Sequence, residues 1–136
     1  MYKCKHFQIY ELVPPDIYKK RDEKAWELLD KKLLITLDLL RDKFGPMKIN
    51  DYRWDGDRMW SGIRTPDSEY YSPTSQHTFG RAADIIFKDV SVDEVRNDII
   101  YHQNATMYRF INAIELNVPW LHIDTRNCRR IKTFSK

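Results

Sequence analysis

The chain has few of the residues that mark several common protein classes. Only two of its 136 residues are cysteines, Cys4 and Cys128, and they lie near opposite ends without the spacing of a zinc-binding or redox motif. We therefore expect two free thiols and no disulfide framework. No apolar run reaches the roughly 18 residues that a membrane-spanning helix requires, so no membrane span is expected.

The N-terminus also lacks the features of a secretory signal. Met1 to His6 leads into mixed polar and aromatic sequence, with neither an apolar stretch nor a small-residue cleavage site. The sequence therefore predicts a protein without a signal peptide. If such a protein acts outside a cytoplasm, something else must release it.

Neither sign of charge is in large excess. The chain has 23 Lys and Arg residues and 20 Asp and Glu residues, for a net charge of +3. The one concentrated basic run comprises Arg126, Arg129, Arg130, Lys132 and Lys136. We interpret it as a solvated face, because proteins that bind nucleic acid carry a wider basic stripe. Adhesion to an anionic polymer such as a cell wall is the alternative, and no nucleic-acid partner is expected.

What the chain does contain is enough apolar sequence for one folded unit. The hydrophobic share of 42% and the aromatic share of 13% are too high for a disordered chain. A length of 136 residues suits one core and leaves no room for a second domain of similar size, so residues 1–136 are expected to form a single domain.

The periodicity of apolar residues predicts two helices. Steps of three or four between Trp26, Leu29, Leu33, Leu37, Leu40 and Phe44 indicate one long amphipathic helix from Asp16 to Phe44, which Gly45-Pro46 ends. Ser91 and Glu94 fit a capping box that opens a shorter helix through about His102.

Alternation and turn residues predict the strands. Before the long helix, His6 to Val13 is expected to be extended. After it, the Asp55-Gly56 turn joins two strands of a hairpin, and the stretch from Thr65 to Thr78 is a loop. The expected strands are Lys48–Tyr52, Arg58–Ile63, Arg81–Phe87, Tyr108–Glu115 and Trp120–Asp124, the last two joined by a turn at 117–119. Together these elements predict an α+β domain with an antiparallel sheet.

Two short segments carry residues suited to a metal site. His77 and Asp84 lie seven residues apart, and His122 follows far downstream on the last expected strand. Catalytic zinc generally takes three protein ligands and leaves a fourth position to water, whose pKa it lowers to about 7. Alternation along that strand places Trp120, His122 and Asp124 on one face. The set of His77, Asp84 and His122 therefore favours a zinc hydrolase.

The surrounding residues extend this pattern into three ordered motifs. They are Ser61-Gly62-Ile63-Arg64, then the ten residues Ser75 to Asp84 (Ser-x-His-x-x-Gly-x-Ala-x-Asp), then Trp120-Leu121-His122-Ile123-Asp124. This order resembles the zinc D-alanyl-D-alanine carboxypeptidase-like peptidases, a family that also includes bacteriophage L-alanyl-D-glutamate endopeptidases and shares its fold with the Hedgehog signalling domain. The resemblance runs from His6-Phe7 and Glu11-Leu12 through Arg126, and the long helix ending in Phe-Gly-Pro is similar to the phage branch.

The resemblance implies roles for several residues. His77, Asp84 and His122 would be the zinc ligands, and Arg64 would bind or polarise the substrate's carboxylate or scissile carbonyl, a role that suits a planar guanidinium. Many relatives place the general base three residues before the last zinc ligand, where this chain has Pro119. Glu115 is the first alternative for the base. Asp124 is the second, although it equally suits orienting His122.

Other candidate residues are expected to have structural roles. We interpret His6 and His102 as surface or capping residues, and Ser75 as a residue that shapes its turn. Trp120 is expected to pack against neighbouring side chains and to form one wall of the metal site. The aromatic residues near the expected hairpin and loop either line a groove for a peptide or sugar or simply pack; they are Trp54, Trp60, Tyr70 and Tyr71.

The resemblance implies a function as well as a fold. It implies a Hedgehog/DD-peptidase-like zinc peptidase that hydrolyses an amide bond in bacterial peptidoglycan stem or cross-link peptides, as a carboxypeptidase or an endopeptidase. We expect a monomeric phage or prophage protein that accumulates in the host cytoplasm before release to the cell wall, or that is virion-associated. The alternative is a non-catalytic zinc-containing wall-binding or virion module of the same fold.

Overall fold

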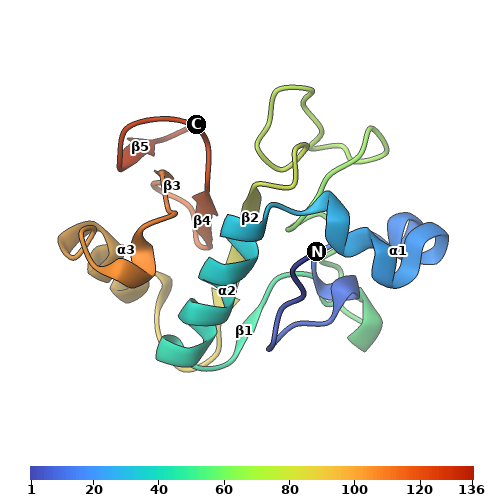
Figure 1. The fold of residues 1–136 in the computed structure, drawn as a ribbon, viewed down its shortest axis with the longest axis horizontal. Helices are drawn as coiled ribbons and strands as arrows, with labels where there is room; N and C mark the ends of the chain where they lie inside the picture. The colour runs from blue at the N-terminus through green and yellow to red at the C-terminus, as the bar shows by residue number, and fades with distance from the viewer.

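A computed structural model describes residues 1–136 and confirms the α+β class, with three α-helices and one five-stranded sheet (Figure 1). None of the helices is both long and apolar enough to cross a membrane. The helices are α1 Pro15–Arg21, α2 Lys31–Phe44 and α3 Val92–Tyr101, and the strands are β1 Met47–Lys48, β2 Ala82–Phe87, β3 Ala113–Glu115, β4 Leu121–Asp124 and β5 Lys132–Phe134.

The sheet is mixed rather than wholly antiparallel. Its strand order is β1-β2-β4-β3-β5, and every neighbouring pair is antiparallel except β3 and β5, which run parallel. Strand β5 was not expected, and it lies inside the basic run that we interpreted as a solvated face. The prediction of a purely antiparallel sheet is therefore wrong at this edge.

The long helix predicted from Asp16 to Phe44 is wrong as a single element. The chain leaves α1 at Asp22, where φ is 47°, continues as a 3-10 helix over Asp22–Leu28, and is extended at Leu29. Asp30 then caps α2, accepting a hydrogen bond from the Lys32 amide at 3.2 Å. The break leaves the Asp30 amide free to donate to the Gly80 carbonyl at 2.9 Å, while its carboxylate accepts from the Thr125 hydroxyl.

The predicted hairpin of Lys48–Tyr52 and Arg58–Ile63 is also wrong. Only Met47–Lys48 is a strand, and it pairs with the end of β2. The Asp51 carboxylate accepts from the Arg58 amide at 2.8 Å, and the Gly56 amide donates to the Asp51 carbonyl at 3.1 Å. These local bonds hold the segment as a closed loop, because an Asp side chain offers the backbone an alternative to a strand ladder.

The remaining elements follow the predictions more closely. Strand β2, strand β4 and helix α3 lie within a residue or two of the expected ranges, and the Ser91 hydroxyl accepts from the Glu94 amide at 3.1 Å. The expected strand Tyr108–Glu115 shortens to β3, because its first residues form a 3-10 turn. The expected extended segment His6–Val13 contains a 3-10 helix at Ile9–Glu11 instead.

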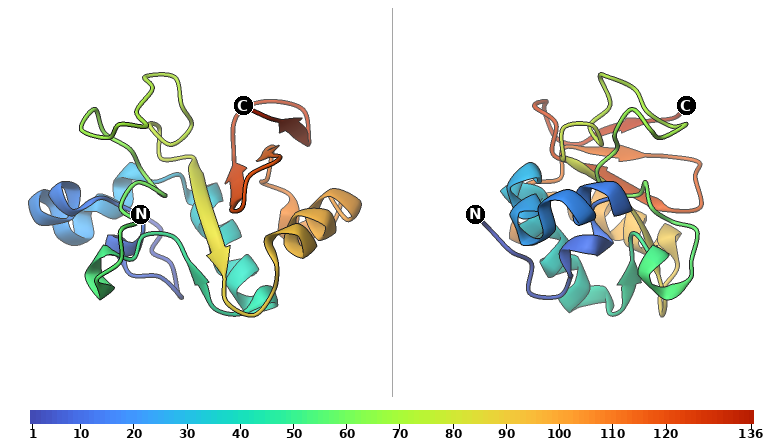
Figure 2. Two further views of the ribbon diagram at one scale, coloured as in Figure 1. Left: turned by 180° about the vertical axis from the view of Figure 1, so that it is seen from behind. Right: turned by 90° about the vertical axis from the view of Figure 1, so that its right-hand side faces the viewer.

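Helix α2 covers one face of the sheet. It crosses in front of β2 in Figure 1 and behind it in the reversed view of Figure 2. Its fully buried Leu33 and Leu37 belong to the same apolar cluster as Ile85, Leu121 and Ile123 on the facing strands. Truncating one such leucine to alanine costs about 2–5 kcal/mol in proteins generally, so this layer contributes substantially to stability. The other face of the same strands carries the polar side chains of Asp84, Glu115, His122 and Asp124.

Candidate metal centre

Strand register places four side chains in a row on the polar face of the sheet. Asp84 of β2 pairs with His122 of β4, and the β3–β4 register, continued by one residue, brings Glu115 to the other side of His122. Glu115 in turn pairs with Phe134 of β5. Residues directly opposite on neighbouring strands project from the same face, so Asp84, His122, Glu115 and Phe134 share one surface.

His77 joins this row from the loop that precedes β2. Its Nε2 lies 3.3 Å from Oδ1 of Asp84, and Nδ1 of His122 lies 2.9 Å from the same oxygen. One ligand atom from each of the three residues lies within 4.8 Å of the other two, and all three side chains are buried. The structure thus brings His77, Asp84 and His122 together as a group that can hold a metal ion.

The segment Ser61 to Arg64 positions His77 and Asp84. The Asp84 amide donates to the Ser61 carbonyl at 2.8 Å, and the Arg64 amide donates to the His77 carbonyl at 3.2 Å. The Ile63 amide donates to the Leu12 carbonyl at 2.9 Å, which brings this segment against the N-terminal region. A Cβ at Gly62 would lie only 2.1 Å from that Leu12 oxygen, so the approach requires glycine.

Each histidine has one ring nitrogen occupied and the other turned toward Asp84. Nδ1 of His77 lies 2.8 Å from the Gly62 carbonyl, which only an N–H can satisfy, and this leaves Nε2 as the basic nitrogen. In His122 the roles are reversed, since Nε2 lies 2.8 Å from Asp124 and Nδ1 faces Asp84. Metal-binding histidines are generally oriented in this way by a carbonyl or carboxylate. Two imidazole nitrogens and one carboxylate oxygen fit the zinc ion.

The protonation of this group follows from burial and charge. Burial lowers the pKa of His77, which is therefore neutral near pH 7. Burial also acts against protonation of His122, but hydrogen bonds to Asp124 and Asp84 outweigh it and raise the pKa of His122. For Asp84 burial acts to raise the pKa, yet the two histidines hold it well below its ordinary value. The Asp84 carboxylate is thus ionised, the form in which a carboxylate binds a metal cation.

Arg64 is fixed beside the metal group. Its Nη2 donates to Oδ2 of Asp84 at 2.9 Å, and its Nε donates to the Trp60 carbonyl at 2.7 Å. The guanidinium also lies 5.7 Å from the ring centre of Tyr70. The remaining nitrogen, Nη1, makes no hydrogen bond within the chain. Arg64 therefore has one donor nitrogen left for a group that enters the site.

Asp124 is fully buried and its hydrogen-bonding capacity is filled. Oδ1 accepts from the Arg126 amide at 3.3 Å and from Nε of Arg126 at 2.7 Å. Oδ2 accepts from Nη2 of Arg126 at 2.7 Å and lies 2.8 Å from Nε2 of His122. A carboxylate offers about four acceptor sites, and all four are used. Asp124 is thus placed to orient His122 rather than to take a proton from water.

Glu115 differs from Asp124 in being unpaired. It is 5% exposed, and its carboxylate accepts no hydrogen bond from any other residue of the chain. It lines the same cleft of about 510 Å³ as His77, Asp84 and His122. Of the two carboxylates weighed as a general base, Glu115 is the one with free oxygen atoms at the metal group.

Other residues named from the sequence surround the cleft or lie away from it. Ser75 shapes its turn, since its hydroxyl accepts a hydrogen bond from the His77 amide at 3.2 Å. Trp120 forms part of the wall of the cleft. His6 lies 2.6 Å from Asp42, and the exposed His102 lies 3.9 Å from Asp98, both outside the site.

Two residues at the site were not recognised from the sequence. Arg126 was grouped with the solvated basic run, although its position two residues after Asp124 is a signal for a contact along one strand face. Phe134 stacks edge-on against His122, with ring centres 5.4 Å apart, and lies 4.9 Å from the Arg126 guanidinium. No local signal marks Phe134, because its place depends on the parallel pairing of β5 with β3.

Comparison of the sequence with models of protein families gives no match. Comparisons with curated proteins and with solved structures also give no match. Function is therefore inferred from the site itself together with the motif resemblance.

Proposed function

We propose that the chain is a zinc-dependent peptidase that hydrolyses an amide bond in the stem or cross-link peptides of bacterial peptidoglycan. The observation that carries this proposal is the buried group of His77, Asp84 and His122, whose ligand atoms lie within 4.8 Å of one another in a cleft that also holds Arg64 and Glu115. The Hedgehog/DD-peptidase fold and the peptidoglycan substrate are part of the proposal and come from the motif resemblance.

The contacts between the three motifs support the resemblance. The first motif supplies the Gly62 carbonyl that orients His77 and the Arg64 guanidinium that pairs with Asp84. The third supplies His122 and the carboxylate of Asp124 that orients it. Residues as far apart in the sequence as Gly62 and Asp124 thus belong to one connected set of contacts, as a shared site requires.

The residues of the chain have distinct roles in the proposed hydrolysis. When bound by His77, Asp84 and His122, zinc supplies Lewis acidity that polarises a carbonyl and makes water more acidic. Glu115 accepts the proton of the attacking water and returns it to the leaving nitrogen. Nη1 of Arg64 donates to the substrate oxygen on which negative charge develops. Asp124 and Phe134 keep the His122 ring in place.

The biological setting belongs to the same proposal. We infer a monomeric phage or prophage protein that accumulates in the host cytoplasm and reaches the wall on release, or that is carried in the virion. The rival proposal is a zinc-containing wall-binding or virion module without turnover, which the presence of Pro119 at the usual base position favours.

The test combines metal analysis with the masses of products from purified muropeptides. We expect about one zinc per chain, one cleaved amide bond, and a loss of about 100-fold or more in kcat for Glu115→Gln with zinc retained. Glu94→Gln, on the exposed side of α3, is the matched control and should keep full activity. A chain that binds zinc and muropeptides but releases no product would establish the non-catalytic module, and a chain without zinc would refute both proposals.

A further inference from the structure

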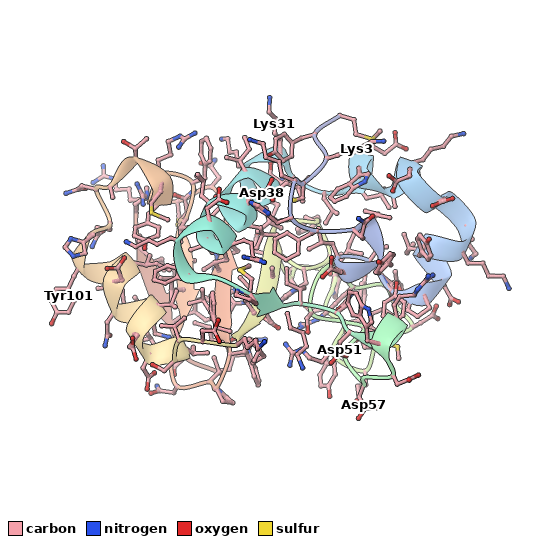
Figure 3. The ribbon with its side chains drawn as sticks, turned by 90° about the horizontal axis from the view of Figure 1, so that it is seen from below. Lys3, Lys31, Asp38, Asp51, Asp57 and Tyr101 are labelled. Carbon is pink, nitrogen blue, oxygen red and sulfur yellow. The ribbon has the colours of Figure 1, made fainter.

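Arg96 is a buried cation that has no part in the hydrolysis as proposed above. It lies on the inner side of α3 with the buried Val95 and Ile99, and it is 7% exposed. The helix stands at one edge of the molecule, where the exposed Tyr101 at its end projects into solvent (Figure 3). Arginine is almost never buried this deeply unless it is paired, so its contacts indicate its role.

The guanidinium of Arg96 is directed at the bend that precedes β4. Its Nη2 donates to the carbonyls of Val118 and Trp120, each at 2.9 Å. Its one carboxylate partner is Asp93 of the same helix, 2.7 Å from Nη1, and the side chain of Asp93 is 85% exposed. Ion pairs at the surface contribute little, whereas hydrogen bonds from a charged donor are stronger than neutral ones. The two carbonyls are therefore the main partners of Arg96.

The bend at 117–120 has few bonds of its own. None of its backbone amides donates to a backbone carbonyl, and Pro119 has no amide hydrogen to donate. Asn117, with φ of 63°, is tied to the C-terminal segment by its side chain alone. The pairing of β4 with β2 begins only after Trp120. Arg96 thus supplies the bonds that hold the backbone at Trp120.

Trp120 is the residue through which this tether reaches the cleft. Its side chain lines the cleft that contains the proposed metal ligands. His122, two residues later, does not depend on the bend, because it pairs with Asp84 across β2 and β4 and its ring is held by Asp124. Loosening the bend should therefore displace the wall of the cleft and leave the metal group in place.

We propose that Arg96 is a positioning residue that fixes Trp120 in the wall of the cleft by binding the carbonyls on either side of Pro119. It acts on a substrate only through Trp120 and does not touch the reacting atoms. Its effect on substrate binding rests on the proposed peptidase function, whereas the tether between α3 and the bend does not.

The first test compares KM, kcat and zinc affinity in Arg96→Met, which removes the donors and keeps an unbranched side chain. We expect KM for purified muropeptides to rise about tenfold with kcat and zinc affinity unchanged, because a contact made equally in the ground state and the transition state affects KM alone. Steady-state kinetics and competition for zinc measure the three quantities. A joint loss of kcat, zinc affinity and melting temperature would show a general structural role and overturn the proposal.

Two further variants assign the effect to the carbonyls. Arg96→Lys keeps a charged donor on a shorter side chain, so KM should rise less than in Arg96→Met; if Arg96→Met does not fold, Arg96→Lys should still raise KM above that of the parent. Asp93→Asn is the matched control, since it removes only the exposed partner of Arg96 and should leave KM unchanged. An unchanged KM in the Arg96 variants, or an equal rise in Asp93→Asn, would overturn the proposal.

A second test does not require activity. The chain has four tryptophans, so isotope-labelled tryptophan gives four indole N–H signals in an NMR spectrum, and Trp120→Phe identifies the one from Trp120. Arg96→Met should shift this signal more than the other three, and Asp93→Asn should not shift it. If no bond in muropeptides is cut, the peptidase function fails and this spectrum alone decides the tether. An unmoved Trp120 signal in Arg96→Met would refute it.

Discussion

Arg126 donates two hydrogen bonds of 2.7 Å to Asp124, one to each carboxylate oxygen. Burial acts to raise the pKa of Asp124, but the hydrogen bonds and charges of Arg126 and His122 together outweigh it and lower that pKa, so Asp124 is ionised. Asp124 in turn holds Nε2 of His122 and fixes which nitrogen of that ring faces the metal group. Arg126 thus acts on the site through two intervening residues.

Arg126→Met should weaken zinc binding by about 10- to 100-fold while the fold is kept, because outer contacts of this kind tune metal affinity to that extent. The measurement is competition for zinc against a chelating dye, with circular dichroism to check folding. Arg129→Met, from the same basic run, is the control and should bind zinc as the parent does. Equal affinity in the two variants would contradict the role of Arg126.

Removal of zinc should lower thermal stability. A ligand that binds only the folded state stabilises it by about 2.7 kcal/mol at a hundred times its dissociation constant. We expect the melting temperature to fall on treatment with a chelator and to recover with added zinc. In His77→Ala the zinc-dependent shift should disappear, whereas His102→Ala should keep it, since His102 is exposed and far from the site. A chelator without effect on the parent chain would count against the metal centre.

Gly62→Ala should be strongly destabilising. The added Cβ would lie 2.1 Å from the Leu12 carbonyl oxygen, a backbone atom that cannot move without displacing the N-terminal segment. Overpacking of this kind costs about 1–3 kcal/mol, and the shift should also move the Gly62 carbonyl away from His77. Urea unfolding measures the first effect and zinc competition the second. Unchanged values in both would show that the segment is not held against Leu12.

The contacts of Asp98 with Tyr108 and Lys43 should make the free energy of unfolding depend on pH in the acid range. The Tyr108 hydroxyl donates to Asp98, and Lys43 lies 2.9 Å away, so the pKa of Asp98 is lowered in the folded chain. A lowered folded pKa gives stability that is fully present above the unfolded value of about 4 and is lost as pH falls through the folded value.

Urea unfolding between pH 6 and pH 2 should show this loss in the parent chain and less of it in Asp98→Asn. The variant should also cost about 1 kcal/mol near neutral pH, the typical net contribution of one hydrogen bond. Asp67→Asn is the control, because Asp67 is exposed and its carboxylate has no partner. Parallel pH curves for Asp98→Asn and the parent would contradict the prediction.

What the sequence could predict was set by local patterns. Alternation in β4 places His122 and Asp124 on one face and Leu121 and Ile123 on the other, and the structure has this arrangement. The Ser91 cap and the strand Ala82–Phe87 follow equally local rules. These elements could be predicted from local sequence alone, without the contacts that they make with distant residues.

What the sequence could not predict depends on distant partners. The helical periodicity is interrupted at Leu29 and Asp30, where contacts with Gly80 and Thr125 replace helical bonds. No pattern near Phe134 reveals its parallel partner in β3, which is Glu115, nineteen residues earlier in the chain. The choice between Glu115 and Asp124 likewise required the contacts of Arg126, which occupy one carboxylate and leave the other free.

Asp30, at the start of α2, contacts both of the segments that carry the proposed metal ligands. Its amide bonds to Gly80, three residues after His77, and its carboxylate bonds to Thr125, three residues after His122. A random mutagenesis screen for lost activity should therefore recover changes at position 30 as readily as changes near the cleft. If the proposed function holds, such variants would look like catalytic defects in an assay, although the altered side chain lies outside the proposed ligand set.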